Sequence, residues 1–392
     1  MKLLRIILVL IFLSGCEKPS WKIVELPSPS GPDSGEPFLA VASEEVWMSW
    51  LEKTSSGQAL KFARWNGEWS KPNVIRSGVP FFVNWADFPS ILPLSGNKVV
   101  AHWLQKKGES TYAYHVMASI SIDQGKTWSH PESAHTDTSA NEHGFASLVD
   151  EGDGNFGIVW LDGRNFKGEH DPSSEMSLMF SKVAGNRFRN EFTIDSRVCD
   201  CCQTAAARTR DGIFIAYRDR SDKEIRDISY VRLSSGQWNQ PKTLHADGWQ
   251  IDGCPVNGPA VEADGDTVVV AWYTGAGDKG RVRVAFSKNS GESFQKPVQV
   301  DDGNPSGRVD VVLLEDQSAV VSWLENQSDK GASIRIRQIF TDGRTGQSLT
   351  VADTTKARSS GFPRMVRAGK DLFLAWTYTA DPPVIRLARI KR

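Results

Sequence analysis

The sequence predicts an all-β fold, a seven-bladed β-propeller with four antiparallel strands in each blade. The first observation is a repeat: short apolar runs end in an aromatic residue at Trp50, Trp103, Trp160, Tyr217, Trp272, Trp323 and Trp376. Successive aromatic residues lie 53, 57, 57, 55, 51 and 53 positions apart. The second observation is that no long stretch has the 3.6-residue periodicity of an amphipathic helix. Six blades remain the alternative, if one repeat lies outside the ring.

Each repeat has the same internal order, which the fifth repeat illustrates. An innermost strand at 258–263 is followed by a turn and by the apolar strand 268–272, which ends in Trp272. A third strand is expected at 281–287 and a short outer strand at 296–301. β-Branched and apolar runs bounded by Gly, Asn and Asp are typical of buried strands and their turns.

The two chain ends predict how the ring closes. The seventh repeat stops after its third strand at 384–390, and an unassigned strand at 21–26 lies near the N-terminus. We expect these two strands to pair, because pairing removes two free sheet edges.

The first sixteen residues predict export and lipid attachment. Lys2 and Arg5 precede an apolar run that is too short to span a bilayer but long enough for a signal peptide. The run ends in Leu-Ser-Gly-Cys at 13–16, which resembles the bacterial lipobox and implies lipidation of Cys16. An ordinary signal peptide is the alternative. The expected organisation is a signal peptide at 1–15, a tether at 16–20 and a propeller domain at 21–392.

The expected location is therefore the bacterial cell envelope. Glu17 follows Cys16, whereas Asp at that position is the signal for retention in the inner membrane, so outer-membrane anchoring is favoured. The chain has 46 basic and 47 acidic residues and a net charge of −1. This balance provides no electrostatic surface for nucleic acid or for anionic lipid. Membrane contact is expected through the lipid alone.

Two turns carry a specific motif. Residues 121–128 read S-I-D-Q-G-K-T-W and residues 287–294 read S-K-N-S-G-E-S-F. Both strings resemble the Asp box of the BNR-repeat, sialidase-like proteins, and the resemblance implies a propeller fold with these turns between the third and fourth strands. The structural residues of the two boxes are Ser121, Asp123, Gly125, Thr127, Trp128, Ser287, Asn289 and Gly291.

The resemblance implies proteins that bind or hydrolyse glycans. The family's sialidases use three arginines for the substrate carboxylate, a Tyr nucleophile with a Glu, and an Asp acid/base. Their early Phe-Arg-Ile-Pro motif is absent here, and the nearest string, at 361–365, has another order and lies in the last repeat. Whether the chain is an enzyme therefore stays open at this stage.

Strand alternation sorts the loops onto two faces. The segments that enter the innermost strands share one face with the loops that follow the second strands, and we call this side the mouth face. Sites in concave folds form where such polar loops converge. The catalytic candidates on this face are Asp162, Asp219, Tyr217 and Tyr273. The ligand-binding candidates are Arg164, Arg218, Arg220, His143, Asn257, Arg308 and Arg364. The structural alternative for all of them is ion pairing or capping of backbone groups.

Four cysteines are expected on the same face. Cys199, Cys201 and Cys202 precede the innermost strand of repeat four, and the alignment of repeats places Cys254 of repeat five beside Cys201. One hypothesis is a disulfide from Cys201 or Cys202 to Cys254. The alternatives are a site for a soft metal such as copper, and a reactive thiol. No cofactor is predicted.

The leading interpretation is a lipid-anchored, sialidase-like propeller that binds or hydrolyses a glycan, with an anionic group held by Arg164, Arg218 and Arg220. The alternatives are a cysteine-centred metal or redox protein and a non-catalytic module that binds another envelope component.

Overall fold

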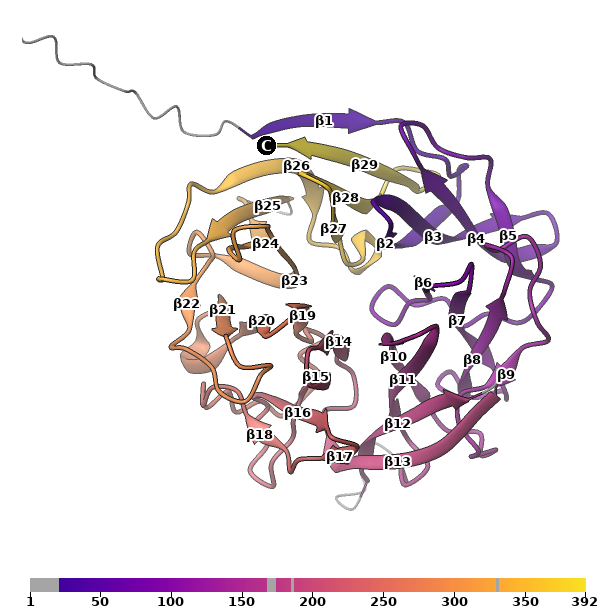
Figure 1. Cartoon of the computed structure of the whole chain (residues 1–392), viewed down its shortest axis with the longest axis horizontal. Helices are drawn as coiled ribbons and strands as arrows, with labels where there is room; N and C mark the ends of the chain where they lie inside the picture. Colours follow the sequence, from indigo (N-terminus) through magenta and orange to yellow (C-terminus); the bar gives the residue numbers. More distant parts are fainter. Residues whose placement is uncertain (1–20, 168–173, 185–186, 329–330) are drawn as a thin grey trace, which may run out of the picture.

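The computed structural model describes residues 21–167, 174–184, 187–328 and 331–392, which form seven antiparallel sheets around a central axis (Figure 1). The prediction of a seven-bladed propeller is confirmed. The signal peptide, Cys16 and the tether lie outside the described residues. Within the described ranges, no helix is long and apolar enough to cross a membrane.

The strands of the first four blades follow the chain from the axis outward. Blade 1 comprises β2 (Ser34–Ala42), β3 (Glu45–Thr54), β4 (Gly57–Trp65) and β5 (Asn73–Ser77). Blade 2 comprises β6 (Ser90–Pro93), β7 (Val99–Lys106), β8 (Tyr114–Ser121) and β9 (Glu132–Ser133). Blade 3 comprises β10 (His143–Gly152), β11 (Asn155–Asp162), β12 (Met176–Ala184) and β13 (Arg187–Val198). Blade 4 comprises β14 (Ala205–Thr209), β15 (Gly212–Arg218), β16 (Ile228–Ser234), β17 (Gln237–Trp238) and β18 (Lys242–Thr243).

The remaining blades have the same order. Blade 5 comprises β19 (Ala260–Asp264), β20 (Thr267–Thr274), β21 (Arg281–Ser287) and β22 (Val298–Gln299). Blade 6 comprises β23 (Pro305–Leu313), β24 (Ala319–Asn326), β25 (Gly331–Ile339) and β26 (Leu349–Thr355). Blade 7 comprises β27 (Arg364–Ala368), β28 (Asp371–Tyr378), β29 (Val384–Lys391) and β1 (Lys22–Leu26). Two short 3₁₀ helices lie in loops, at Ala276–Asp278 and Arg358–Ser360.

The ring closes through strands from opposite ends of the chain. β1 pairs antiparallel with β29, from Lys22 opposite Lys391 to Leu26 opposite Leu387. The expected pairing of the N-terminal strand with the last repeat is confirmed (Figure 1). Each blade therefore has an outer strand, and the edge of β29 is covered.

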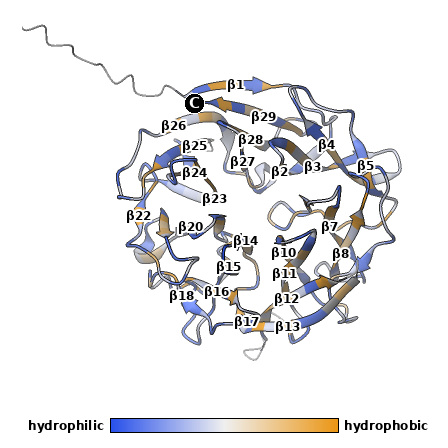
Figure 2. Cartoon of the chain, viewed as in Figure 1, coloured by the Kyte–Doolittle hydropathy of each residue, from blue (hydrophilic) through white to orange (hydrophobic). Residues whose placement is uncertain are grey.

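The cores lie between neighbouring blades. Large buried side chains of the second strands, such as Trp103, Trp160 and Trp272, have no exposed surface. Figure 2 shows hydrophobic residues along the strands of every blade. Each sheet is buried on both faces by its neighbours, which explains why the second strands have continuous apolar runs instead of alternation.

Most second strands end in the same hydrogen bond. The indole N–H of the terminal Trp donates to a side-chain oxygen two residues later: Trp50 to Glu52, Trp103 to Gln105, Trp160 to Asp162 and Trp323 to Glu325. In blade 5 the residue two positions after Trp272 is Thr274, and Asp247 accepts the bond instead. A buried indole N–H needs such an acceptor.

The two turns that resemble the Asp box lie between the third and fourth strands of blades 2 and 5, as expected. In the first turn, Asp123 accepts hydrogen bonds from the backbone and hydroxyl of Thr127, and Ser121 accepts one from the backbone of Gly125. Gly125 has φ 81°, and a Cβ there would lie 2.4 Å from the ring of Phe62. In the second turn, Ser287, Asn289 and Gly291 make the equivalent contacts.

Candidate functional site

Residues 84–88 cover the mouth of the central channel. They belong to blade 2, but the amide of Gln203 in blade 4 donates to the carbonyl of Ala86 over 2.6 Å. Trp85 stacks on Phe362 at the start of blade 7, with ring centroids 5.8 Å apart. The guanidinium of Arg308 in blade 6 lies 4.8 Å from the Trp85 ring. This segment therefore reaches across the axis, and Figure 1 shows the loop before β6 extending toward the centre.

Beneath this cover lies the central cavity, in two sections. The section next to the mouth has a volume of about 100 Å³ and is lined by residues from the beginnings of the innermost strands, including Asp87, Thr204 and Phe362. The second section, of about 440 Å³, is lined by later residues of those strands, including Glu262 and Arg367. Only the second section reaches the roughly 300 Å³ of ordinary ligand pockets.

Arg364 lines both sections and was one of the predicted ligand-binding residues. Its guanidinium lies 4.8 Å from the ring of Phe38 and 5.8 Å from that of Phe88. Its Nε is 3.3 Å from Asp310 Oδ2, outside hydrogen-bond geometry. Asp310 is thus its ionic partner, but no hydrogen bond from the guanidinium is found among the described residues, so N–H donors remain for a ligand in the cavity.

Three carboxyl groups of raised pKa share this cavity. Burial raises the pKa of Asp87 to about 7 and also raises the pKa of Asp310. Glu262 is exposed to the open space of the wider section, and desolvation by the surrounding channel raises its pKa to about 7. Carboxyls that stay protonated near neutral pH are the usual acid/base candidates. Glu262 was not among the predicted site residues, because nothing in its strand marks it as facing the axis.

Asp162, which was predicted as an acid/base, accepts a hydrogen bond from the indole of Trp160 and has Arg164 as a second partner. It is fully buried and accepts hydrogen bonds from Trp160 Nε1 (2.8 Å) and from Arg164 Nε and NH2 (2.7 and 2.8 Å). Burial opposes ionisation, but the bonds from Arg164 hold the pKa of Asp162 below its usual value. The structure therefore gives Asp162 an ionised, structural role and occupies much of Arg164, which also contacts Glu191 at 3.4 Å.

Tyr217 and Asp219 lie between blades 3 and 4, away from the cavity lining. The Tyr217 hydroxyl donates to Asp195 of β13 over 2.6 Å, and the phenol is buried. Burial and the charge of Asp195 raise its pKa, which opposes a role as nucleophile. Asp219 accepts a hydrogen bond from the hydroxyl of Ser229, and burial raises its pKa.

Two predicted anion-binding arginines are already occupied. Arg218 is 2% exposed and donates to the carbonyls of Arg226, Asn257 and Tyr273. Arg220 donates through Nε and NH2 to the carboxylate of Glu224. Arg218 joins blades 4 and 5 by these bonds, and a buried guanidinium with filled donors is not available to a ligand.

The other predicted site residues of blades 5 and 6 are Asn257, Arg308 and Tyr273, and their contacts are structural. Asn257 accepts a hydrogen bond from the backbone N–H of Arg308, over 2.7 Å. Arg308 donates to Ser360, Gly361 and Ala357, and burial lowers its pKa to about 10. Burial raises the pKa of Tyr273, whose ring packs edge-on against Trp249. None of these three side chains lines the central cavity.

The structure brings the four cysteines together, as the alignment of repeats predicted for Cys201 and Cys254. Cys199 Sγ lies 3.3 Å from Cys202 Sγ and 3.9 Å from Cys201 Sγ, and Cys201 and Cys254 sulfurs are within 4.8 Å. We expected Cys201 and Cys202 to point to opposite sides if their stretch is extended. It is not: 200–201 form a turn between β13 and β14, so three sulfurs converge. All four are free thiols in the structure, and the disulfide stays a prediction.

The surroundings shift the pKa values of Cys199 and Cys202 in opposite directions. Arg226 is buried and its NH1 lies 3.4 Å from Cys199 Sγ. Although burial acts in the opposite direction, contacts from Cys201, Cys202 and Arg226 lower the pKa of Cys199 well below its usual value. Burial and the neighbouring Cys199 raise the pKa of Cys202. One thiolate beside other thiols can bind a soft metal ion first, and the neighbouring sulfurs can then complete the coordination of that ion.

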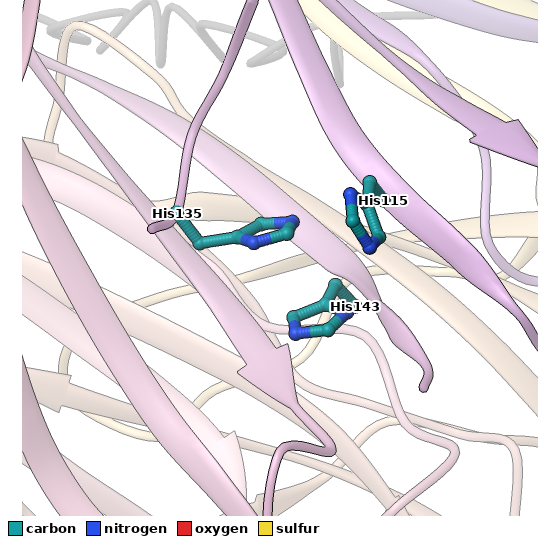
Figure 3. A group of neighbouring side chains, drawn as sticks. All are labelled: His115, His135 and His143. Carbon is teal, nitrogen blue, oxygen red and sulfur yellow. The ribbon is translucent and has the colours of Figure 1, made fainter. Parts of the chain in front are cut away.

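His143 lies outside the cavity, among other polar side chains. It is fully buried at the start of β10, and His115 and His135 pack against its ring (Figure 3). Its Nε2 is 3.0 Å from Asp137 Oδ2. Sequence analysis missed His115, His135 and Asp137, because their separation along the chain matches no local metal-binding pattern.

Comparison with known proteins finds structural similarity alone. No family model matches the chain, and no curated protein matches its sequence. A polysaccharide lyase described as an ulvan lyase has a TM-score of 0.61 at 13% identity, covering 93% of this chain and 95% of its own. The α-L-arabinanase of Penicillium chrysogenum has a TM-score of 0.52 at 11% identity, covering 80% and 96%. The intramolecular trans-sialidase of Ruminococcus gnavus has a TM-score of 0.50 at 11% identity, covering 80% and 97%.

These neighbours establish the fold class. The chain has a propeller architecture shared with sialidase, polysaccharide lyase and arabinanase propellers. Identities of 11–13% show the fold and leave the reaction open, since one fold carries many functions.

Proposed function

We propose that this protein is an envelope propeller, anchored by a lipid at Cys16, that binds a glycan carrying an acidic group in its central cavity. The observation that carries the proposal is Arg364. Its guanidinium lines the cavity near two aromatic rings and forms an ion pair with Asp310, but among the described residues it donates no hydrogen bond. A guanidinium fork binds a carboxylate or sulfate through paired hydrogen bonds, and aromatic rings suit the apolar face of a sugar.

The structural neighbours support the class of ligand. They are propellers whose descriptions name sugar-acting enzymes, and the ulvan lyase was also solved with a bound unit of glucuronic acid and sulfated rhamnose. The wider section of the cavity is the part with room for a sugar, at about 440 Å³. We therefore place the sugar in the wider section, with its acidic group toward Arg364. The mouth-face site expected from the sequence would require residues 84–88 to move aside.

The contacts of the predicted catalytic residues favour glycan binding over glycan hydrolysis. Asp162, Asp219 and Tyr217 have structural partners, and Tyr273, the fourth predicted catalytic residue, does not line the cavity. If the protein also cleaves its ligand, Glu262 is the acid that the cavity offers, because its pKa of about 7 keeps it protonated near neutrality.

The test is a binding screen with acidic and neutral oligosaccharides at pH 6, followed by titration calorimetry. We expect binding of uronate- or sialate-containing chains, weakened roughly 10- to 100-fold in Arg364→Gln through loss of a charged hydrogen-bonding fork. Arg344→Gln is the matched control, because Arg344 is exposed and pairs only with Asp342 beside it. Equal affinity in Arg364→Gln, or no glycan bound by the wild type, would remove the proposal.

The cysteine cluster favours a second candidate function, the binding of a soft metal by thiolates. Three sulfurs converge beside the Arg226 guanidinium, and Cys254 adjoins them. Loading with Cu⁺ should protect all four thiols from alkylation, and Cys201→Ser should abolish that protection. Four thiols protected before any metal is added, and released only by a reductant, would instead support the predicted disulfides.

A further inference from the structure

Three histidines from two blades form a compact group outside the central cavity. His115 lies in β8, His135 follows β9, and His143 begins β10, so the group bridges blades 2 and 3 near the mouth face (Figure 3). The ring centroids of His135 and His143 are 3.9 Å apart, and His115 lies 4.6 and 5.0 Å from them. All three side chains are buried.

One nitrogen of each ring is fixed by a backbone carbonyl. These contacts are His115 Nε2 to Ser139 O (2.8 Å), His135 Nδ1 to Asp137 O (2.9 Å) and His143 Nδ1 to Asn141 O (3.1 Å). The single segment 137–141 therefore orients all three rings. In metal sites, ligating histidines almost always donate their second nitrogen in this way, which leaves the first nitrogen unprotonated for the metal.

The group also contains an unpaired nitrogen, and its possible ligand atoms are close together. His135 Nε2 is buried and has no hydrogen-bond partner, although leaving a buried polar atom unpaired is costly. One nitrogen from each of the three rings lies within 4.8 Å of the other two. In a tetrahedral zinc site with bonds of about 2.0–2.1 Å, ligand atoms are about 3.4 Å apart. Because the rings of His135 and His143 are stacked at an angle of 9°, one of them must rotate for both to direct a nitrogen at one ion.

Asp137 supplies an anionic oxygen at the same place. Its Oδ2 is 3.0 Å from His143 Nε2 and accepts a hydrogen bond from the Ser139 hydroxyl. Asp162 Oδ2 is 3.7 Å from the same nitrogen, but its oxygens are occupied by Trp160 and Arg164. Asp137 is the nearer of the two carboxylates to His143, and Asp162 adds negative charge behind the ring.

We propose that His115, His135, His143 and Asp137 bind one divalent first-row cation, Zn²⁺ being the representative. Three imidazoles and one carboxylate are the donors such ions prefer, whereas Ca²⁺ and Mg²⁺ require oxygen ligands. A cavity of about 190 Å³ lined by His115, His135 and Asp137 adjoins the site and provides access and room for a water ligand. The site is separate from the thiol cluster and does not depend on glycan binding.

Replacing a histidine by Asn or Gln removes the nitrogen that would bind the metal and can keep the hydrogen bond that orients the side chain. In His135→Asn, the amide nitrogen takes the place of Nδ1 and can still donate to Asp137 O, but the free Nε2 is lost. In His115→Gln, the amide nitrogen takes the place of Nε2 and can still donate to Ser139 O, and the free Nδ1 is lost. His130→Asn is the matched control, because His130 is exposed and its Nδ1 contacts the carbonyl of Pro131.

The experiment is titration of the chelator-treated protein with Co²⁺ and Zn²⁺, followed by absorbance and by equilibrium dialysis. We expect one ion per chain with the visible bands of a nitrogen and oxygen site. His135→Asn and His115→Gln should each weaken it roughly 100-fold or more, since even outer-shell changes cost 10- to 100-fold. His130→Asn should bind like the wild type.

The thiols provide an internal reference in the same spectrum. Co²⁺ bound by cysteine gives intense sulfur-to-metal absorption in the near ultraviolet, which a histidine site lacks. The histidine variants should lose the visible component and keep any sulfur component. Zn²⁺ should also raise the Tm of the wild type and not of His135→Asn, by linkage of binding to folding. Ion binding unchanged in both histidine variants, or confined to the sulfur component, would overturn the proposal.

Discussion

At the scale of single residues, the polar groups divide into those with partners and those without. Arg218 and Asp162 are charged and buried, yet Arg218 donates to carbonyls of blades 4 and 5 and Asp162 accepts from Trp160 and Arg164 beside it. Arg364 and His135 differ, because a donor or acceptor of each lacks a partner in a site with room for a ligand. Other buried donors, such as Trp376 Nε1, are also unpaired, so the adjoining space is what distinguishes these two residues.

Asp87 predicts a pH-dependent stability. The hydroxyl of Tyr114 lies 2.9 Å from Asp87 Oδ2 and 2.7 Å from Glu142 Oε1, and its one proton can serve only one of the two carboxylates. Burial keeps Asp87 protonated up to a pKa of about 7. The folded state thus binds one proton more than the unfolded state between about pH 4 and 7, so this contribution is full at low pH and is lost as pH rises through 7.

The measurement is urea unfolding of the wild type and of Asp87→Asn at pH 5 and 7. Asp87 should make the wild-type free energy of unfolding about 2 kcal/mol larger at pH 5 than at pH 7, relative to the variant. Buried His102, whose pKa burial lowers to about 3, acts in the opposite direction in both proteins, so only their difference is informative. An identical pH dependence in the two proteins would contradict the assignment.

At the scale of elements, the end of the second strand is a repeated structural unit. An indole N–H and an acceptor two residues later occur in four blades, and blade 5 substitutes Asp247. The unit explains why acidic residues follow the aromatic position so regularly. It also explains why the sequence predicted Asp162 as a catalytic acid. An acidic residue two positions after the aromatic residue can accept the structural hydrogen bond, and the same residue could act as an acid/base at the mouth face.

The structural role of the hydrogen bond from the indole can be tested at Glu325. Its carboxylate accepts hydrogen bonds from Trp323 Nε1 (2.6 Å) and from the backbone of Asn304 (2.7 Å), and it is 5% exposed. Glu325→Ala leaves these donors without an acceptor and should lower the free energy of unfolding by about 2–3 kcal/mol. Glu315→Ala, at an exposed position, should change it by less than about 0.5 kcal/mol in the same denaturation series. Equal losses in both variants would contradict the structural role.

At the scale of the whole molecule, ring closure joins residues that are more than 350 positions apart. β1 supplies the outer strand of blade 7, and Ile23 and Leu26 pack against the cores on its two sides. β1 begins shortly after the predicted tether at 16–20 and holds the ring closed, so the proposed lipid anchor would adjoin the strand that closes the propeller.

Truncation tests ring closure. A chain beginning at Pro27 loses the β1–β29 ladder and the packing of Trp21, Ile23 and Leu26, and its free energy of unfolding should fall by roughly 3–6 kcal/mol. The free edge of β29 should also promote self-association. A chain beginning at Trp21 is the control and should remain as stable as longer forms. Denaturation and size-exclusion chromatography measure both effects, and unchanged stability of the shorter chain would contradict the role of β1.

The sequence alone determined the repeating architecture of this protein. Blade number, strand order and the pairing of 21–26 with the last repeat follow from a period near 54 residues, because each repeat must bury its apolar strands against its neighbours. The Asp-box turns are local, so their hydrogen bonds were also predictable. The approach of Cys254 to Cys201 followed from aligned repeats.

Only the tertiary structure decided which polar residues are free. The cover formed by 84–88, the filled donors of Arg218 and the open guanidinium of Arg364 depend on contacts between blades far apart in sequence. The histidine group depends on one loop, 137–141, that turns three rings from two blades toward one point. Repetition specifies the scaffold because every blade has the same packing task, whereas the sites arise from contacts that occur once and that no periodic pattern contains.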